Sequence, residues 1–179
     1  MHCPIRNAAG SLPALALIAA GTLGAAAQEE MTRATAKLTT ADGMPAGNVE
    51  FTGGPNGVVV EVLAVGLAPG QHAIHLHETG SCAPDFSAAG GHYAPMGKSH
   101  GFLSPNGPHA GDLPNVTVSV DGAATAQFFN PRVRLDDGET GLFDEDGTAV
   151  IVHELADTHG ATAEFGQAVA CGVIEPLAE

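Results

Sequence analysis

Short apolar runs separated by tight-turn signals recur along this chain, and they limit its fold more than any other feature. Residues 58–67, for example, are rich in β-branched and apolar side chains, and no segment shows a sustained helical stripe. Asp-Gly and Pro-Gly pairs punctuate these runs. Many short strands joined by such turns indicate an all-β, antiparallel sandwich or barrel.

The clearest hairpin is expected at residues 116–128. Two stretches of strand-forming residues flank Asp121-Gly122 there. An Asp-Gly pair between strands is typical of a type I′ turn, in which both central residues have positive φ. We therefore expect such a turn at this position.

Two histidines at the end of another expected strand indicate metal chemistry. His75 and His77 would face the same side of a strand, whereas a helix would separate them by about 200°. His153 closes a second apolar run and would deliver a third imidazole from a neighbouring strand. The intervening Gly- and Pro-rich segment holds four more candidate ligands: His92, His100, His109 and Asp112.

The residue types narrow the choice of metal. A site made of imidazoles alone suits copper, zinc, iron or nickel, and three histidines with one aspartate make a reasonable tetrahedral zinc cage. Seven candidate ligands are too many for one four-coordinate ion. Two ions that share one bridging imidazole would use them all.

These motifs resemble the Cu,Zn superoxide dismutase family over about residues 48–175. The most specific stretches are HAIHLHE at 72–78, GGHYAP at 90–95, HAGDLPNV at 109–116, VHE at 152–154 and ACGVI at 170–174. The resemblance implies an eight-stranded antiparallel Greek-key barrel with two long functional loops, residues 79–114 and 154–169. It also implies disproportionation of superoxide, a small-molecule substrate, to oxygen and hydrogen peroxide.

The family pattern assigns a role to each ligand. It implies two metal sites: copper on His75, His77, His92 and His153, and zinc on His92, His100, His109 and Asp112. His92 would be the bridging imidazolate and the catalytic proton carrier. Asp157 would accept the free N–H groups of His75 and His100 and fix their tautomers. His72 and His159 have no such role: we expect the first to be structural and the second to be a solvated loop residue.

One position departs from the family pattern. Family members normally carry an arginine three residues before the final cysteine, where this chain has Ala168. The loop at 154–169 contains no lysine or arginine. Electrostatic steering changes association rates by ~10 to 10³, so we expect a dismutase of reduced efficiency.

Two questions follow from this departure. Weaker guidance of the anion could come from Lys98, Arg132 or Arg134. The alternative function is a non-catalytic copper and zinc binding protein of the envelope, a metal buffer or carrier on the same barrel.

The first 27 residues have the pattern of a secretory signal peptide. Arg6 precedes an apolar stretch, and Ala25-Ala26-Ala27 offers a cleavage site of small residues. The sequence therefore predicts one domain at residues 28–179, in the periplasm or secreted after cleavage near Ala27. Cys82 and Cys171 would remain, and an even count in an oxidising compartment favours one bridge. The family resemblance pairs these two cysteines.

The charge balance restricts the partners. Six lysines and arginines stand against twenty acidic residues, which gives a net charge of −14. Such a balance argues against nucleic acid or an anionic membrane as a partner. The sequence does not decide whether the protein forms a homodimer, because no apolar interface stripe stands out.

Overall fold

The computed structural model describes residue 1, residues 32–162 and residues 164–177. Apart from Met1, the predicted signal peptide lies outside this described part. The elements are β1 (Arg33–Thr40), β2 (Pro45–Gly54), β3 (Gly57–Ala64), β4 (Gly70–His72), β5 (Ile74–His77), the 3₁₀ helix η1 (Phe86–Ala89), β6 (Val116–Val118), β7 (Ala124–Asn130), β8 (Ala149–His153) and β9 (Ala168–Pro176). No helix within the described residues has the length and hydropathy of a membrane span.

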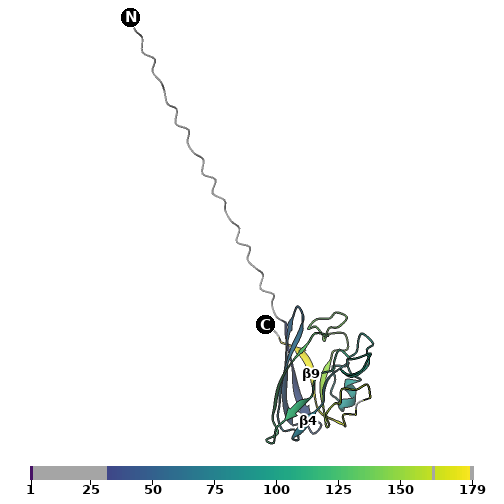
Figure 1. Ribbon diagram of the computed structural model, residues 1–179. Coiled ribbons are helices and arrows are strands. Elements are labelled where there is room, and N and C mark those ends of the chain that lie inside the picture. The colour runs from purple at the N-terminus through teal and green to yellow at the C-terminus, as the bar shows by residue number, and fades with distance from the viewer. Residues whose placement is uncertain (2–31, 163, 178–179) are drawn as a thin grey trace.

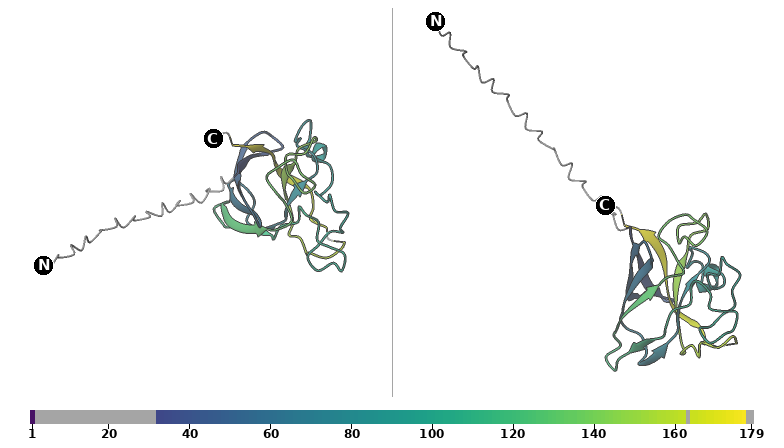
Figure 2. Two further views of the ribbon diagram at one scale, coloured as in Figure 1. Left: turned by 90° about the horizontal axis from the view of Figure 1, so that it is seen from above. Right: turned by 45° about the horizontal axis from the view of Figure 1, so that its top comes forward.

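The strands curl into an antiparallel barrel (Figures 1 and 2). Seven of them form one sheet in the order β5-β8-β9-β1-β2-β3-β7, and β4 pairs with β6. Because only Ala73 separates β4 from β5, and β6 lies beside β7, the order closes on itself. If β4 and β5 are counted as one strand, the barrel has eight strands. The pairing of β3 with β7, which skips the strands between them, is a Greek-key connection.

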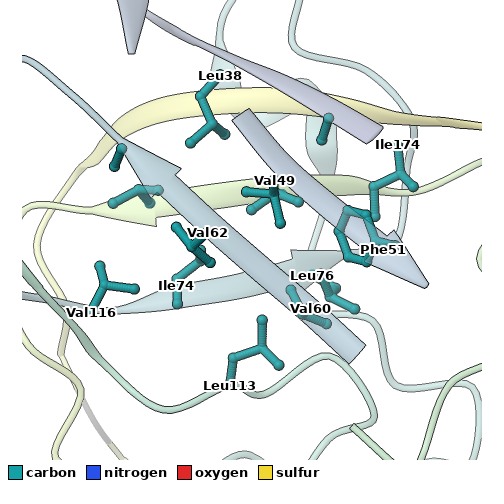
Figure 3. Close-up of a cluster of buried hydrophobic side chains, with 14 of the residues drawn as sticks. Leu38, Val49, Phe51, Val60, Val62, Ile74, Leu76, Leu113, Val116 and Ile174 are labelled. Atoms are coloured by element: carbon teal, nitrogen blue, oxygen red, sulfur yellow. The ribbon is translucent and has the colours of Figure 1, made fainter. Parts of the chain in front are cut away.

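Side chains that alternate along the strands fill the interior of the barrel. Figure 3 shows Leu38, Val49, Phe51, Val60, Val62, Ile74, Leu76, Leu113, Val116 and Ile174 gathered in one core. Ile74 and Leu76 of β5 belong to this core, so His75 and His77 point to the opposite face of the strand. The core residues fix which face of β5 carries imidazoles, because a shift by one residue would bury the histidines among them.

Two long loops cover the outer face of β5 and β8. Residues 78–115 join β5 to β6, and residues 154–167 join β8 to β9. A disulfide between Cys82 and Cys171 ties the first loop to β9, which confirms the predicted pairing. Leu113, which is 2% exposed, anchors the far end of the same loop in the barrel core.

The predicted type I′ turn at Asp121-Gly122 was wrong. Gly122 has a φ of 80°, but Asp121 is not among the described residues with positive φ. The Gly122 N–H donates to the Ser119 carbonyl at 3.0 Å, and the Ser119 N–H donates to the Ala123 carbonyl at 2.8 Å. Only one residue is left-handed, as in a type I turn followed by a glycine bulge.

Candidate metal centre

Four histidines come together on the outer face of the barrel. His75 and His77 lie on β5, His153 ends β8, and His92 lies in the 78–115 loop, joined to His77 by an isolated β-bridge. One ring nitrogen from each lies within 4.8 Å of the others. We call His75, His77, His92 and His153 the strand-side cluster.

Hydrogen bonds determine which ring nitrogens in this cluster are bare. His77 Nδ1 lies 2.9 Å from the Gly90 carbonyl oxygen, and His75 Nε2 lies 3.1 Å from Asp157 Oδ2. A carbonyl or carboxylate oxygen can only accept, so both of these nitrogens carry hydrogen.

The remaining nitrogens of His75, His77 and His153 lack hydrogen-bond partners. His75 Nδ1, His77 Nε2 and both ring nitrogens of His153 are buried without a hydrogen bond. Buried polar atoms in proteins are rarely left unpaired, and the cost of leaving them so is about 1–3 kcal/mol each. A bound metal ion would take the lone pairs of His75 Nδ1, His77 Nε2 and one nitrogen of His153, because imidazole nitrogen is a ligand that copper prefers.

A second group has the spacing of a tetrahedral ion site. Asp112 Oδ1 lies 3.3 Å from His92 Nδ1, 3.1 Å from His100 Nδ1 and 3.4 Å from His109 Nδ1. His92 Nδ1 and His109 Nδ1 are 3.4 Å apart. Zinc bonds of 2.0–2.1 Å in a tetrahedron place the ligand atoms about 3.3–3.4 Å apart. We call His92, His100, His109 and Asp112 the loop-side cluster.

His75 also approaches the loop-side cluster but does not fit as its fourth member. One of its ring nitrogens lies within 4.8 Å of donor atoms of His92, His100 and Asp112. However, its Nε2 is bonded to Asp157, and its Nδ1 faces the strand-side cluster. His109, whose Nδ1 lies close to both His92 and Asp112, completes the group.

Asp112 and Asp157 accept hydrogen bonds that hold the two clusters in place. Asp112 Oδ2 accepts the backbone N–H groups of Gly101 at 2.8 Å and His109 at 3.0 Å. Asp157 lies between His75 and His100, 3.1 Å from one Nε2 and 3.2 Å from the other. Burial favours the neutral acids, yet the hydrogen bonds outweigh it and hold the pKa of both carboxyls well below the ordinary value. Both are therefore charged acceptors at neutral pH.

Three histidines of the strand-side cluster are neutral at neutral pH, which is the form of imidazole that binds a metal. Burial lowers the pKa of His75 and of His77 to about 4. Burial, together with the neighbouring histidines, lowers the pKa of His153 to about 3. Since a metal binds the neutral imidazole, these rings need lose no proton at neutral pH.

Two supporting residues were not identified from the sequence. The Arg132 guanidinium donates to the carbonyl oxygens of His109 and Asp112 at 3.3 and 2.9 Å, so it holds the backbone of the loop-side cluster. The Asn115 side chain donates to the Asp157 carbonyl and accepts the Asp157 N–H, each at 2.8 Å. Asn115 could have been suspected from its place in the HAGDLPNV motif. Arg132 carries no local signal, because it follows β7 far along the chain.

The three candidate guiding cations line one cavity. Lys98, Arg132 and Arg134 line a cavity of about 390 Å³, together with Gly107 and other residues of the 78–115 loop. No histidine of the strand-side cluster lines this cavity. Guidance of the anion by one of these cations stays a prediction.

His159 is not the solvated loop residue expected from the sequence. Its N–H donates to Asp157 Oδ1 at 2.6 Å, and its ring lies 5.1 Å from the ring of Phe102. His72 is buried, with its ring nitrogens 2.8 Å from the carbonyl oxygens of His153 and Ala68. Both residues therefore hold the polypeptide around the two clusters.

Ala168 lies beside the site, at the start of β9. It is the cross-strand partner of His153. Its side chain packs near Cys82 and Phe86 and lines a cavity of about 410 Å³. No histidine of either cluster lines this cavity.

Comparison with known proteins identifies the family. Residues 45–174 match the copper/zinc superoxide dismutase family. The chain is 44% identical over 149 residues to a Cu-Zn superoxide dismutase of Caulobacter vibrioides, covering 79% of this chain and 85% of that protein. It is 41% identical over 147 residues to Cu-Zn superoxide dismutase 2 of Aquifex aeolicus, covering 79% and 86%.

A solved structure agrees with these relatives. A superoxide dismutase-like protein from Bacillus subtilis superposes with a TM-score of 0.73 at 36% identity, covering 78% of this chain and 96% of that one. The fold, the paired donor clusters and the relatives all lead to one assignment. The chain is a member of the copper/zinc superoxide dismutase family, an enzyme that acts on superoxide and uses copper and zinc as cofactors.

Proposed function

We propose that the strand-side cluster holds copper, that the loop-side cluster holds zinc, and that superoxide is disproportionated at the copper side. Bound copper supplies the one-electron chemistry by which one superoxide is oxidised to oxygen and a second is reduced to peroxide. The observation that carries this proposal is the set of bare, buried nitrogens on His75, His77 and His153, beside a group of four donors around Asp112.

His92 connects the two clusters and is the proposed proton carrier. Its Nδ1 faces Asp112 and His109, which leaves Nε2 for the strand-side cluster. Two superoxide anions need two protons to leave as oxygen and hydrogen peroxide. A neutral His92 could hold one of these protons at Nε2 and pass it to the substrate. The loop-side donors keep the ring in place while the proton moves.

We also propose that capture of the anion is slow for this family. Ala168 offers no charge where family members normally have an arginine, and the loop beside it carries Glu154, Asp157 and Glu164. The whole chain has a net charge of −14, which repels superoxide. Steering by a well-placed cation changes association rates by ~10 to 10³, so its loss lowers kcat/KM rather than removing activity.

Ala168→Arg tests this proposal directly. Ala168 pairs with His153 across β8 and β9, so an arginine there adds a positive charge near the strand-side cluster and should raise kcat/KM by about tenfold at low ionic strength, with the gain shrinking as salt screens the field. Pulse radiolysis across a salt series, on protein with verified copper and zinc content, gives the rates. Val120→Arg is the matched control, because it adds the same charge on a fully exposed turn.

The same measurement separates the two candidate functions. A metal buffer or carrier on this barrel would bind both ions tightly but would show no dismutation in the parent or in Ala168→Arg. The position of Ala168 and the acidic loop are the observations that favour this second function. A fast parent enzyme that is insensitive to salt would overturn the proposal of slow capture.

The location of the protein in the cell is also proposed. We infer that residues 1–27 are removed on export and that the mature protein is periplasmic or secreted. The disulfide between Cys82 and Cys171 supports an oxidising compartment. Intact-mass measurement of the exported protein should give a chain that begins near Gln28 with no free thiol.

A further inference from the structure

One aromatic ring in the 154–167 loop lies directly on the histidines of both clusters. The Phe165 ring centroid is 4.9 Å from His75, 5.3 Å from His92 and 5.0 Å from His153. It is also 5.2 Å from the ring of His100. A single side chain thus contacts three rings of the strand-side cluster and two rings of the loop-side cluster, since His92 belongs to both.

The backbone holds Phe165 in this place. The Leu155 N–H donates to the Phe165 carbonyl at 2.8 Å, and the Glu154 N–H donates to the Gln167 carbonyl at 2.8 Å. Gly166 lies between these two bonds with a φ of 70°, and a Cβ there would come within 3.0 Å of the Glu154 side chain. The turn therefore requires glycine, and it directs the preceding ring toward the histidines.

Phe165 lies between the histidines and solvent. Its residue is partly exposed, whereas His75 is fully buried and His153 is 7% exposed. A phenyl ring can neither ligate a metal nor pair with an anion. What it can do is exclude water and limit the space above the imidazoles.

We propose that Phe165 is the apolar cover of the metal centre, and that it determines how easily small anions and chelators reach the two clusters. The effect on anions and chelators rests on the proposed metal sites, whereas the position of Phe165 over the histidines does not. In a loop without a lysine or arginine, access is then governed by the size of this side chain.

The first test uses metal-free protein and does not depend on catalysis. Diethyl pyrocarbonate modifies neutral imidazole nitrogens, and peptide mass mapping gives a rate for each histidine. In Phe165→Ala, modification of His92 and His153 should become about tenfold faster, the effect expected when the shell around a site is opened. His72, which has no described ring contact with Phe165, should keep its rate.

A series of variants controls for loss of folding. Phe165→Leu should give a rate between those of the parent and of Phe165→Ala, because leucine retains part of the volume. Phe129→Ala removes an aromatic ring that is 57% exposed on β7, and it should change no histidine rate. If Phe165→Ala proves unfolded by circular dichroism, Phe165→Leu against the parent decides the question. Equal rates in the folded variants would overturn the proposal.

The second test uses the protein loaded with copper and zinc. Phe165→Ala should release metal to EDTA about tenfold faster than the parent, and azide titrated against the copper absorption should bind more tightly. Unchanged release and azide affinity would also overturn the cover. Parent protein that takes up neither ion would refute the proposed metal sites, while the modification rates would still decide the role of Phe165.

Discussion

The two clusters differ in what holds them. Three of the four strand-side histidines lie on β5 and β8, which pair with each other and turn their alternate residues into the barrel core. The loop-side residues His100, His109 and Asp112 all come from the 78–115 loop. They are positioned by single hydrogen bonds, by Arg132 and by the disulfide.

This difference indicates two kinds of dependence. His75, His77 and His153 are as rigid as the barrel, because moving them would require moving the sheet register, whereas His92 comes from the 78–115 loop. The loop-side cluster depends on a long segment whose closure costs entropy, which the disulfide and the bound ion offset. Changes in the loop should therefore affect the zinc side first, and changes in the strands should affect the copper side alone.

Removal of one ligand from each cluster is the strongest test of this separation. His75→Ala should abolish copper binding and leave zinc at one per chain, whereas Asp112→Ala should release mainly zinc. A ligand loss should exceed the roughly 10- to 100-fold typical of outer-shell changes. Elemental analysis after dialysis gives both contents. If either variant lost both metals equally, the clusters would not be separable.

Asp157 is shared by the two clusters and should not discriminate between them. It accepts from His75 and His100, so Asp157→Ala should weaken copper and zinc together, by about 10- to 100-fold. Competition with a chelator of known affinity gives the two constants. A loss confined to one metal would show that Asp157 serves only that side.

Breaking the disulfide should affect the loop far more than the barrel. The bridge spans 89 residues of sequence, so Cys82→Ser should lower the free energy of unfolding by about 4.6 kcal/mol on the chain-entropy argument. Hydrogen exchange should show the gain in exposure over residues 78–115, with β1 to β3 protected as before. Uniform loss of protection would contradict the division between loop and barrel.

Acid should destabilise the metal-free protein through the strand-side histidines. Their folded pKa values of about 4 for His75 and His77 and about 3 for His153 lie below the ordinary 6.5. The unfolded chain therefore binds protons that the folded chain excludes, and stability is lost as the pH falls from about 6.5 towards 4. We expect a loss of at least about 2 kcal/mol.

Urea unfolding of metal-free protein between pH 7 and pH 4.5 measures this loss. Asp112 and Asp157 add to it only at lower pH, because their folded pKa values lie below the ordinary 3.8. Stability that is flat across the interval would mean that the histidines are open to solvent in the metal-free protein.

The smallest expected effect is at Arg132. Arg132→Lys keeps the charge but loses the forked contact with the His109 and Asp112 carbonyls, so zinc affinity should fall by about tenfold while copper affinity stays near that of the parent. Arg134→Lys is the matched control, because Arg134 does not contact these carbonyls in the described hydrogen bonds. Equal effects of the two variants would remove Arg132 from the support of the loop.

The local sequence pattern was sufficient to predict most of the fold. The alternation at His75 and His77 placed both imidazoles on one face of a strand, and the turn signals separated the strands. The failures lay in local geometry that the residue types alone did not specify. His159 was expected in solvent but lies against Asp157, and Asp121-Gly122 was expected to form a turn with two left-handed residues but has one.

The sequence by itself determined the chemistry of the site: which imidazoles and carboxylates are available, and which of them share a strand face. That information is local, because side-chain alternation and donor type follow from neighbours in the chain. Only the tertiary structure decided which ring nitrogens of His75 and His77 are bare, that Arg132 binds the backbone of the loop, and that Phe165 lies against the histidines. These features depend on contacts between segments far apart in sequence, and no local pattern encodes the distance between them.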